Sequence, residues 1–461
     1  MPSAAPCNPV ILVPGIKGSE LTDEYRTTRD AVWSVLASVQ GDYKRLALHP
    51  DDRRYERIEP ARIAPGPLFN LIYEQFMTSL RHELSPQEDR PTPVYAFPYD
   101  WRRGLADVQT QLGDFIDEVI ARTSLLRHYW QSDWRRAPRV NLVGHSMGGL
   151  VVAGYLAQRG GDRKVGRVAT LAAPFQGSAN AVLTIATGQS SLTSFAASPA
   201  EREVARLMPA VYHLLPSYAA ELAWPGGLAR SFYKPLAWQP SVYETIAEYI
   251  RLYSRREASE LAKLPDRIAD AVGILKSILV AAQAHRASVD TLDLKKAGLS
   301  AADWLCIAGI GEPTVDRIVA TTQPLRDPKE FANAALFEDG TGMQIDLAAS
   351  APVDTWDAAH PDVPAPRTGD STVPLAGATP AFLPYESLVA VTRAHFAWWE
   401  LADRLVNGIV DLHASLPRMN AVQSMVVAHF LGRDVRAVKA LPAPGVKAAD
   451  WAPPVGGLAA G

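Results

Sequence analysis

The hydrophobic positions of this chain alternate between short apolar runs and longer stretches in which apolar residues recur at helical spacing. Short apolar runs between turn residues are typical of buried strands, and their alternation with helices is typical of an α/β fold with a mainly parallel sheet. We predict core strands at residues 10–13, 93–97, 140–143, 165–172, 304–308 and 388–391. We predict helices at residues 68–84, 104–122, 149–159 and 396–406.

Strand signals disappear between about residues 177 and 299, where helical runs and loops with Pro and Trp take over. This change predicts a helical cap or lid inserted at 178–299 between two parts of an α/β core, 1–177 and 300–440. We expect the lid itself within residues 178–205. The Pro-, Ala- and Gly-rich segment 441–461 is predicted to be a flexible tail.

One apolar run ends in the G-x-S-x-G pattern of a nucleophile elbow, RVNLVGHSMGGL at residues 139–150. A serine on a sharp strand-to-helix turn has a strained backbone, which needs small neighbours such as Gly144 and Gly148. We therefore predict Ser146 to be a nucleophile. The alternative is an ordinary Gly-rich loop with a capping serine.

A serine hydroxyl needs a neighbouring base, and the base needs a carboxylate that orients it. In α/β-hydrolases these follow the serine in the order acid, then histidine. Asp370, in the polar turn RTGDSTVP, is the predicted acid, and His395, after the predicted last strand, is the predicted base.

Other acids and histidines compete for these two roles. The competing acids are Asp339, Asp354, Asp357 and Asp362. The competing histidines, each more simply a surface or packing residue, are His213, His360, His413 and His429. His145 adjoins the nucleophile, but the geometry of an elbow directs its side chain away.

An acyl-transfer site also needs backbone amides that bind the oxyanion. The Met147 amide follows the serine, and we predict the second donor to be the Ile16 amide in the turn VPGIKGSEL, with Lys17 as the alternative. Predicted substrate contacts are Lys17, Trp33, Phe69, Tyr99 and Trp398, although core packing explains the aromatic residues equally well.

Composition limits the classes of protein to which this chain can belong. The 461 residues are 48% hydrophobic and 21% charged, which is typical of a globular protein. A net charge of −3 gives no electrostatic basis for nucleic-acid binding, and two cysteines exclude a disulfide-rich framework. The sequence has no Cys/His cluster that would indicate a metal site. Acyl transfer by a serine nucleophile needs no metal or organic cofactor, so we predict none. The N-terminus lacks a basic region and no apolar run reaches about 18 residues, so we predict a cytoplasmic protein that contacts membranes at most peripherally.

Two segments, VILVPGIKGSEL at 10–21 and YAFPYDWRR at 95–103, resemble the lecithin:cholesterol acyltransferase family, which includes lysosomal phospholipase A2 and the phospholipid:diacylglycerol acyltransferases. Further matching segments are GHSMGG at 144–149, AAPFQGS at 172–178, GIGEPT at 309–314 and GDSTVP at 369–374. The resemblance implies an α/β-hydrolase fold with a cap, and it carries the family's triad over to Ser146, Asp370 and His395. It also carries an oxyanion amide over to Ile16.

The resemblance further implies a serine-dependent lipid acyl hydrolase or O-acyltransferase that acts through an acyl-enzyme. A phospholipid or other lipid ester would be the substrate, taken up during a transient contact with a lipid interface. The chain lacks the signal and cysteine pairs of the animal members, which favours an intracellular bacterial-type relative. A carboxylesterase of small soluble esters is the alternative, and a binding protein on a hydrolase scaffold is a third. Asp100 and Arg102 are predicted to form a buried ion pair with no catalytic part.

Overall fold

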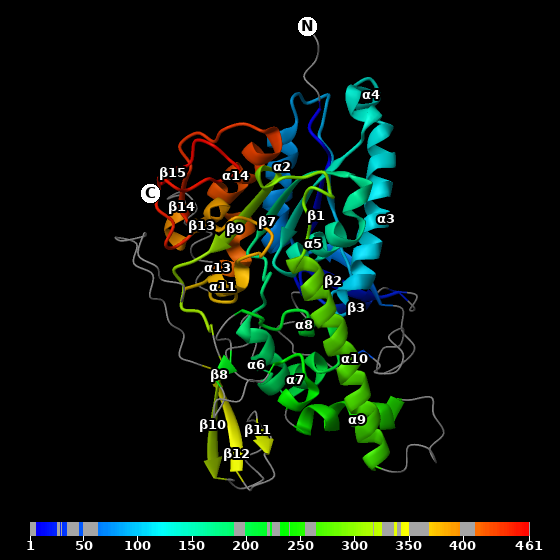
Figure 1. Cartoon of the computed structure of the whole chain (residues 1–461). Helices are drawn as coiled ribbons and strands as arrows, with labels where there is room; N and C mark the ends of the chain where they lie inside the picture. The colour runs from blue at the N-terminus through cyan, green and yellow to red at the C-terminus, as the bar shows by residue number, and fades with distance from the viewer. Residues whose placement is uncertain are drawn as a thin grey trace.

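The computed structural model describes residues 6–24, 28, 30–34, 46–48, 63–188, 199–218, 222–223, 231–238, 240–253, 264–316, 318–324, 336–338, 343–349, 368–396 and 411–460. Within these ranges, eight strands form the main sheet in the upper half of Figure 1. In spatial order they are β5 (Val94–Ala96), β1 (Val10–Val13), β6 (Val140–His145), β7 (Val165–Leu171), β9 (Trp304–Gly309), β13 (Val389–Val391), β14 (Lys439–Pro442) and β15 (Ala459–Ala460). Neighbouring strands are parallel except for β13 and β14.

Apolar side chains cover both faces of this sheet. Along β1, Val10 and Leu12 join one hydrophobic cluster, whereas Ile11 and Val13 join the other, because successive side chains of a strand point to opposite faces. The first cluster includes residues of α2 (Asn70–Leu84) and α14 (Asn420–Leu431), and the second includes residues of α3 (Leu105–Ser124) and α5 (Met147–Arg159). The sheet is therefore the middle layer of three, as parallel sheets require.

A helical cap lies below the carboxyl ends of the central strands (Figure 1). Its helices are α6 (Ala179–Thr187), α7 (Pro199–Ala205), α8 (Pro209–Tyr212), α9 (Pro240–Tyr253) and α10 (Leu264–Asp290). The segment Arg267–Asp290 of α10 is long and apolar enough to cross a membrane, with a mean hydropathy of 1.3. Because α10 packs against α5, α8 and α9, its composition also suits a cap helix.

Two smaller sheets accompany the main one. A sheet beside the core consists of β3 (Asp30–Trp33), β2 (Ser19–Asp23) and β4 (Ile63–Leu68). Another, at the lower end of Figure 1, consists of β11 (Leu336–Glu338), β12 (Met343–Ala349), β10 (Ile318–Pro324) and β8 (Leu222–Ala223). The described residues also include three short helices: α4 (Arg127–Trp130), α11 (Leu375–Ala378) and α13 (Leu412–Ser415).

The α/β fold class is confirmed, and all six predicted core strands belong to the main sheet. Three predicted helices correspond to α2, α3 and α5, while most of the fourth, at 396–406, lies outside the described residues. β10, β11 and β12, in the part of the chain that we assigned to the core, form a separate sheet in which β10 pairs with β8 of the cap region. The remaining domain boundaries stay predictions.

The prediction of a flexible tail at 441–461 is wrong. β14 pairs with β13, and β15 pairs with β14. Between these strands, the indole nitrogen of Trp451 donates a hydrogen bond of 2.9 Å to the Leu388 carbonyl oxygen. A composition rich in Pro and Gly did not reveal these contacts, because they depend on a sheet edge supplied by distant parts of the chain.

Candidate active site

Ser146 occupies a sharp turn between β6 and α5. Its backbone has φ 53° and ψ −128°, a conformation that a residue with a side chain adopts only when its surroundings enforce it. The Ser146 amide donates to the Leu171 carbonyl oxygen at the end of β7 (2.8 Å). The turn therefore places Ser146 at the carboxyl edge of the sheet, as the elbow pattern predicts.

Glycines allow this turn to pack against its neighbours. A Cβ atom at Gly148 would lie 2.2 Å from the Val13 carbonyl oxygen, and one at Gly144 would lie 2.7 Å from the Cα atom of Gly149. A Cβ atom at Gly15 would approach that of Ser146 to 2.8 Å. The loop after β1 thus lies directly against Ser146.

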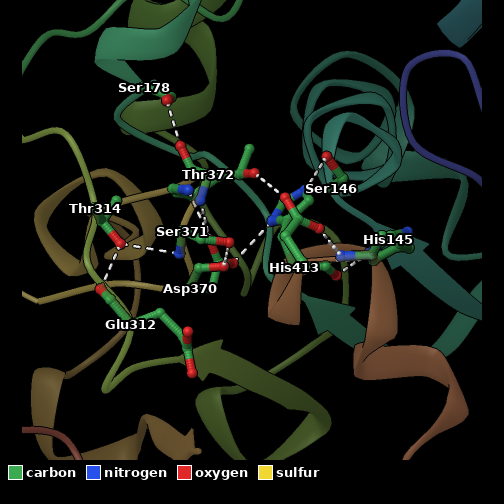
Figure 2. Close-up of polar contacts among 12 residues, drawn as sticks. His145, Ser146, Ser178, Glu312, Thr314, Asp370, Ser371, Thr372 and His413 are labelled. Atoms are coloured by element: carbon green, nitrogen blue, oxygen red, sulfur yellow. Dashed lines mark hydrogen bonds and ion pairs between the residues drawn. The ribbon is translucent and has the colours of Figure 1, made fainter. Parts of the chain in front are cut away.

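Ser146, His413 and Asp370 lie in a hydrogen-bonded row (Figure 2). The serine Oγ lies 2.8 Å from Nε2 of His413, and Nδ1 of the same ring lies 2.8 Å from Oδ2 of Asp370. Because a carboxylate only accepts, Nδ1 carries the proton and Nε2 is left to accept one from the serine. All three side chains are buried. This is the geometry of an activated serine nucleophile.

The prediction of His395 as the base is wrong. Its Nδ1 accepts a hydrogen bond from the Thr392 amide (2.9 Å), and the ring caps a short 3-10 helix at Arg393–His395. Its place after the last parallel strand made it a plausible base, but local capping occupies the ring. His413 is instead the second residue of α13, and Asp411, the N-cap residue two positions earlier, is the sequence signal for that helix start.

The other competing residues that the structure describes bond elsewhere than to Ser146. Nε2 of His429 bonds the Val168 carbonyl oxygen (3.0 Å), and Nε2 of His213 accepts from the Leu105 amide (3.4 Å). The remaining candidates lie outside the described residues: Asp339, Asp354, Asp357, Asp362 and His360.

Asp370 is fixed by the turn that contains it. Its Oδ1 accepts from the amides of Thr372 (3.0 Å) and Val373 (2.6 Å), which leaves Oδ2 for His413. Thr314 of the GIGEPT segment supports the turn, because its hydroxyl oxygen accepts from the Ser371 amide (2.9 Å; Figure 2). The GIGEPT segment therefore holds the acid in place.

The charges around His413 favour its protonated form. Burial alone would lower the pKa of His413, but the Asp370 carboxylate at Nδ1, assisted by Asp411, raises the pKa above the ordinary value of 6.5. Asp411 contacts the turn that contains Asp370, where its carboxylate accepts a hydrogen bond from the Thr372 hydroxyl. These two carboxylates thus stabilise the imidazolium form of His413.

His145 is uncharged and supports the backbone of His413. Burial, with His413 nearby, lowers the pKa of His145 to about 3. Its Nε2 donates to the His413 carbonyl oxygen (3.0 Å), so Nδ1 accepts from the Tyr73 hydroxyl (2.8 Å). The Tyr73 oxygen in turn accepts from the Gly15 amide (3.0 Å). These bonds connect the loop after β1 with the backbone of His413.

Residues 15–18 form a tight turn in that loop. The Gly18 amide donates to the Gly15 carbonyl oxygen (3.1 Å), and Lys17 has a left-handed φ of 61°. Ile16 lines the same cavity as Ser146, and Met147 begins α5, where an amide has no partner within the helix. The amides that we predicted to bind the oxyanion thus belong to the two segments that flank the serine.

The PYDWR segment supports this turn from behind. The Tyr99 hydroxyl donates to the Pro14 carbonyl oxygen (2.9 Å), and the Trp101 indole donates to the Ser19 carbonyl oxygen (3.0 Å). Arg102 and Asp100 form two parallel hydrogen bonds of 2.8 Å, so the predicted buried ion pair is present. Tyr99 is therefore a packing residue, which corrects its prediction as a substrate contact.

A small cavity of about 80 Å³ opens beside the serine. Most of its surface is apolar, and its lining comes from the core and from the cap: Ile16, Lys17, Ser146, Pro174, Ser178, Asn180, Ala181, Thr184, Glu201, Met208, Val211, Leu214, Thr372, Val373 and His413. Lys17, a predicted substrate contact, is one of these lining residues. Trp33 and Phe69 are not part of the lining, and Trp398 lies outside the described residues.

A mainly parallel sheet between two layers of helices, with a serine elbow at the carboxyl edge of the sheet, defines an α/β-hydrolase fold. The chain belongs to the lecithin:cholesterol acyltransferase family, whose model matches residues 73–364, more than half of the protein. The resemblance noted in the sequence is therefore confirmed. The matched range includes Ser146 and ends before Asp370. This membership supports a lipid acyl hydrolase or acyltransferase.

The fold also resembles a solved structure. A chain in "The crystal structure of Tle4-Tli4 complex" aligns with a TM-score of 0.52 and 15% sequence identity, over 80% of this chain and 88% of that chain. At this identity the likeness concerns the fold alone. No curated protein matches the sequence.

The packing of the elbow predicts a strong effect of a single methyl group. Gly148→Ala forces a Cβ atom against backbone oxygens that cannot rotate away, so we expect the free energy of unfolding to fall by about 1–3 kcal/mol. Gly273→Ala, in α10 with nothing within 4 Å of the added carbon, is the matched control and should stabilise by about 0.5–1 kcal/mol. Urea unfolding of both variants measures this, and equal stabilities would contradict the packing described here.

Proposed function

We propose that the protein is a serine-dependent lipid acyl hydrolase or O-acyltransferase, similar to a phospholipase A or a lipase, with Ser146, His413 and Asp370 as its catalytic triad. The hydrogen-bonded row from Asp370 through His413 to Ser146 carries this proposal. Membership of the lecithin:cholesterol acyltransferase family supports the choice of lipid acyl esters as substrates.

In the first half of the reaction, His413 takes the proton of the Ser146 hydroxyl as Oγ attacks the ester carbonyl. Asp370 holds the imidazole and stabilises its positive charge. The amides of Ile16 and Met147 donate to the oxyanion of the tetrahedral intermediate. Oriented donors of this kind typically lower a barrier by about 2.7–4 kcal/mol each.

The intermediate then collapses as His413 returns its proton to the departing alcohol, a lysolipid or a glycerol. An acyl group remains on the Ser146 oxygen. Water or a second alcohol, deprotonated by His413, attacks this ester and releases a fatty acid or a new ester. Whether hydrolysis or transfer dominates depends on how far the cap excludes water from the cavity.

The size of the cavity favours a second candidate, a carboxylesterase of small soluble esters. A space of about 80 Å³ is far below the roughly 300–1,000 Å³ of common ligand pockets. A lipid substrate therefore requires the cap to move, and we propose that this happens during a transient contact with a lipid interface. A small ester requires less movement.

Product analysis distinguishes these functions. The protein and Ser146→Ala are incubated with mixed phospholipid liposomes that contain a long-chain alcohol, and the products are identified by mass spectrometry. We expect fatty acid and lysolipid, or acylated alcohol, from the wild type alone, because the variant lacks the nucleophile. If the wild type leaves the lipids intact but cleaves short soluble esters, the small-ester function replaces the lipid one.

The two histidines give opposite predictions. His413→Ala should lower kcat/KM on a short ester by a factor on the order of 10⁴, because the serine loses its base. His395→Ala should keep nearly full activity and lose about 1 kcal/mol of stability, the typical value of a lost cap. Rates and urea unfolding are measured for both. Loss of activity in His395→Ala with survival in His413→Ala would refute the proposed triad.

Asp411 should affect the pH dependence of the reaction. His413 must be neutral to act as a base, so its raised pKa places the acid limb of kcat/KM above pH 6.5. Asp411→Asn removes a negative charge that favours the imidazolium, while an amide oxygen can still cap α13. We therefore expect the acid limb to move to lower pH.

The control for this pH profile is Asp133→Asn, which removes an exposed carboxylate distant from the triad. It should leave the acid limb where it is in the wild type. An identical limb in Asp411→Asn and the wild type would contradict the influence of Asp411 on His413.

A further inference from the structure

The peptide group between Pro14 and Gly15 is held at both edges. Its carbonyl oxygen, that of Pro14, accepts from the Tyr99 hydroxyl (2.9 Å), and its N–H, that of Gly15, donates to the Tyr73 hydroxyl oxygen (3.0 Å). Both tyrosine side chains are buried. Because a peptide group is planar, hydrogen bonds at opposite edges fix its orientation. The chain therefore enters the turn at residues 15–18 in one direction.

This orientation determines that of the next peptide group, which joins Gly15 to Ile16. The Gly15 carbonyl oxygen accepts from the Gly18 amide within the turn, so the Ile16 N–H at the opposite edge points the other way. Among the described residues, the Ile16 amide donates to no backbone oxygen. A Cβ atom at Gly15 would lie 2.8 Å from that of Ser146, so the turn adjoins the serine directly. The direction of the proposed oxyanion donor thus depends on the peptide group that Tyr73 holds.

The Tyr73 hydroxyl is itself oriented by hydrogen bonds. It gives its one proton to Nδ1 of His145 (2.8 Å), because Nε2 of that ring donates to the His413 carbonyl oxygen (3.0 Å). Burial raises the pKa of Tyr73 and lowers the pKa of His145 to about 3, so the phenol keeps its proton and the ring stays neutral. A charged ring would carry a proton at Nδ1, and the hydroxyl oxygen would then face two N–H donors. All these bonds therefore run one way, from the Gly15 amide to the backbone of His413.

We propose that Tyr73 is a positioning residue for the proposed reaction. Its hydroxyl sets the orientation of the Ile16 amide, and His145 connects that amide's turn to the backbone of His413. This inference rests on the proposed function and adds a residue to its machinery. Tyr73 belongs to α2, and the described residues that line the cavity beside Ser146 do not include it. It therefore acts through the turn rather than on a substrate.

A pair of ketones tests this role. Hexyl trifluoromethyl ketone has an activated carbonyl, to which the Ser146 oxygen adds while the serine proton passes to His413 and the carbonyl oxygen becomes an oxyanion. Hexyl methyl ketone has the same chain, but its carbonyl is too unreactive to add. The inhibition constant Ki of each ketone is measured against hydrolysis of a short soluble ester. The first constant reports on the oxyanion donors, and the second reports on binding alone.

Tyr73→Phe removes the hydroxyl and keeps the ring. We expect Ki of the trifluoromethyl ketone to rise about tenfold and kcat/KM on the ester to fall by the same factor. Complete loss of an oxyanion donor lowers a rate by about 10²–10³, and a misdirected donor loses less. Ki of the methyl ketone should stay unchanged, because the cavity keeps its lining.

The matched control is Tyr129→Phe, which removes another buried hydroxyl, one that donates to the Cys7 carbonyl oxygen (2.6 Å). Tyr129 belongs to α4, at the end of the molecule opposite the cap (Figure 1). Both inhibition constants should therefore keep their wild-type values in this variant. Urea unfolding shows whether each variant is folded.

If Tyr73→Phe does not fold, two variants of His145 replace it. His145→Leu removes the acceptor that orients the Tyr73 hydroxyl and should raise Ki of the trifluoromethyl ketone selectively. His145→Asn places a side-chain oxygen near the position of Nδ1, where it can accept the same proton, so the rise should be smaller. Equal effects of the two variants would overturn the inference.

The outcomes separate this inference from the proposed function. If the folded wild type neither cleaves the ester nor binds the trifluoromethyl ketone more tightly than the methyl ketone, the proposed function fails. If the wild type does both, and Tyr73→Phe leaves the two constants unchanged or raises them by the same factor, only this inference is overturned. A selective rise for the trifluoromethyl ketone supports it.

Discussion

The close contact between the loop after β1 and the start of α5 determines the rest of the site. The carbonyl oxygens of Val13 and Pro14 lie so near Gly148 that a Cβ atom there would overlap them. The turn at residues 15–18 lies against Ser146, which has a positive φ. Because backbone atoms cannot rotate away as side chains do, the nucleophile and the proposed oxyanion amides share one rigid arrangement, which is the preorganisation that acyl transfer requires.

Features that depend on local sequence were predictable. The six core strands are apolar runs long enough to be buried on both faces, and such runs carry their own signal. Ser146 was identified by the spacing of Gly144 and Gly148 around it, although it is the distant Val13 and Pro14 that require a glycine at 148. Asp370 was identified because the same short turn supplies the two amides that hold its carboxylate. In each case, the sequence signal lies within a few positions of the residue concerned.

Features that depend on distant contacts were not predictable in this way. His395 and His413 both follow apolar segments, and the sequence around them does not tell which ring meets Asp370. The Thr392 amide holds the His395 ring locally. The ring of His413 reaches the carboxylate through a distant contact, in which the His413 amide donates to the Asp370 carbonyl oxygen (3.2 Å). The C-terminal strands were missed for the same reason, since β14 forms only on an edge that β13 provides.

The cap walls of the cavity are connected to the turn that holds Asp370. At the start of α6, the Ser178 hydroxyl and the side-chain amide of Asn180 both donate to the Thr372 carbonyl oxygen (2.6 and 3.2 Å; Figure 2 shows the first). Thr372 belongs to the turn that contains Asp370, so displacement of α6 would disturb that carboxylate. The neighbouring wall, α7, packs against α6, and Arg206 just after α7 donates to the carbonyl oxygens of Ile185 and Ala186. The cap walls and the carboxylate that orients His413 therefore form one connected structure.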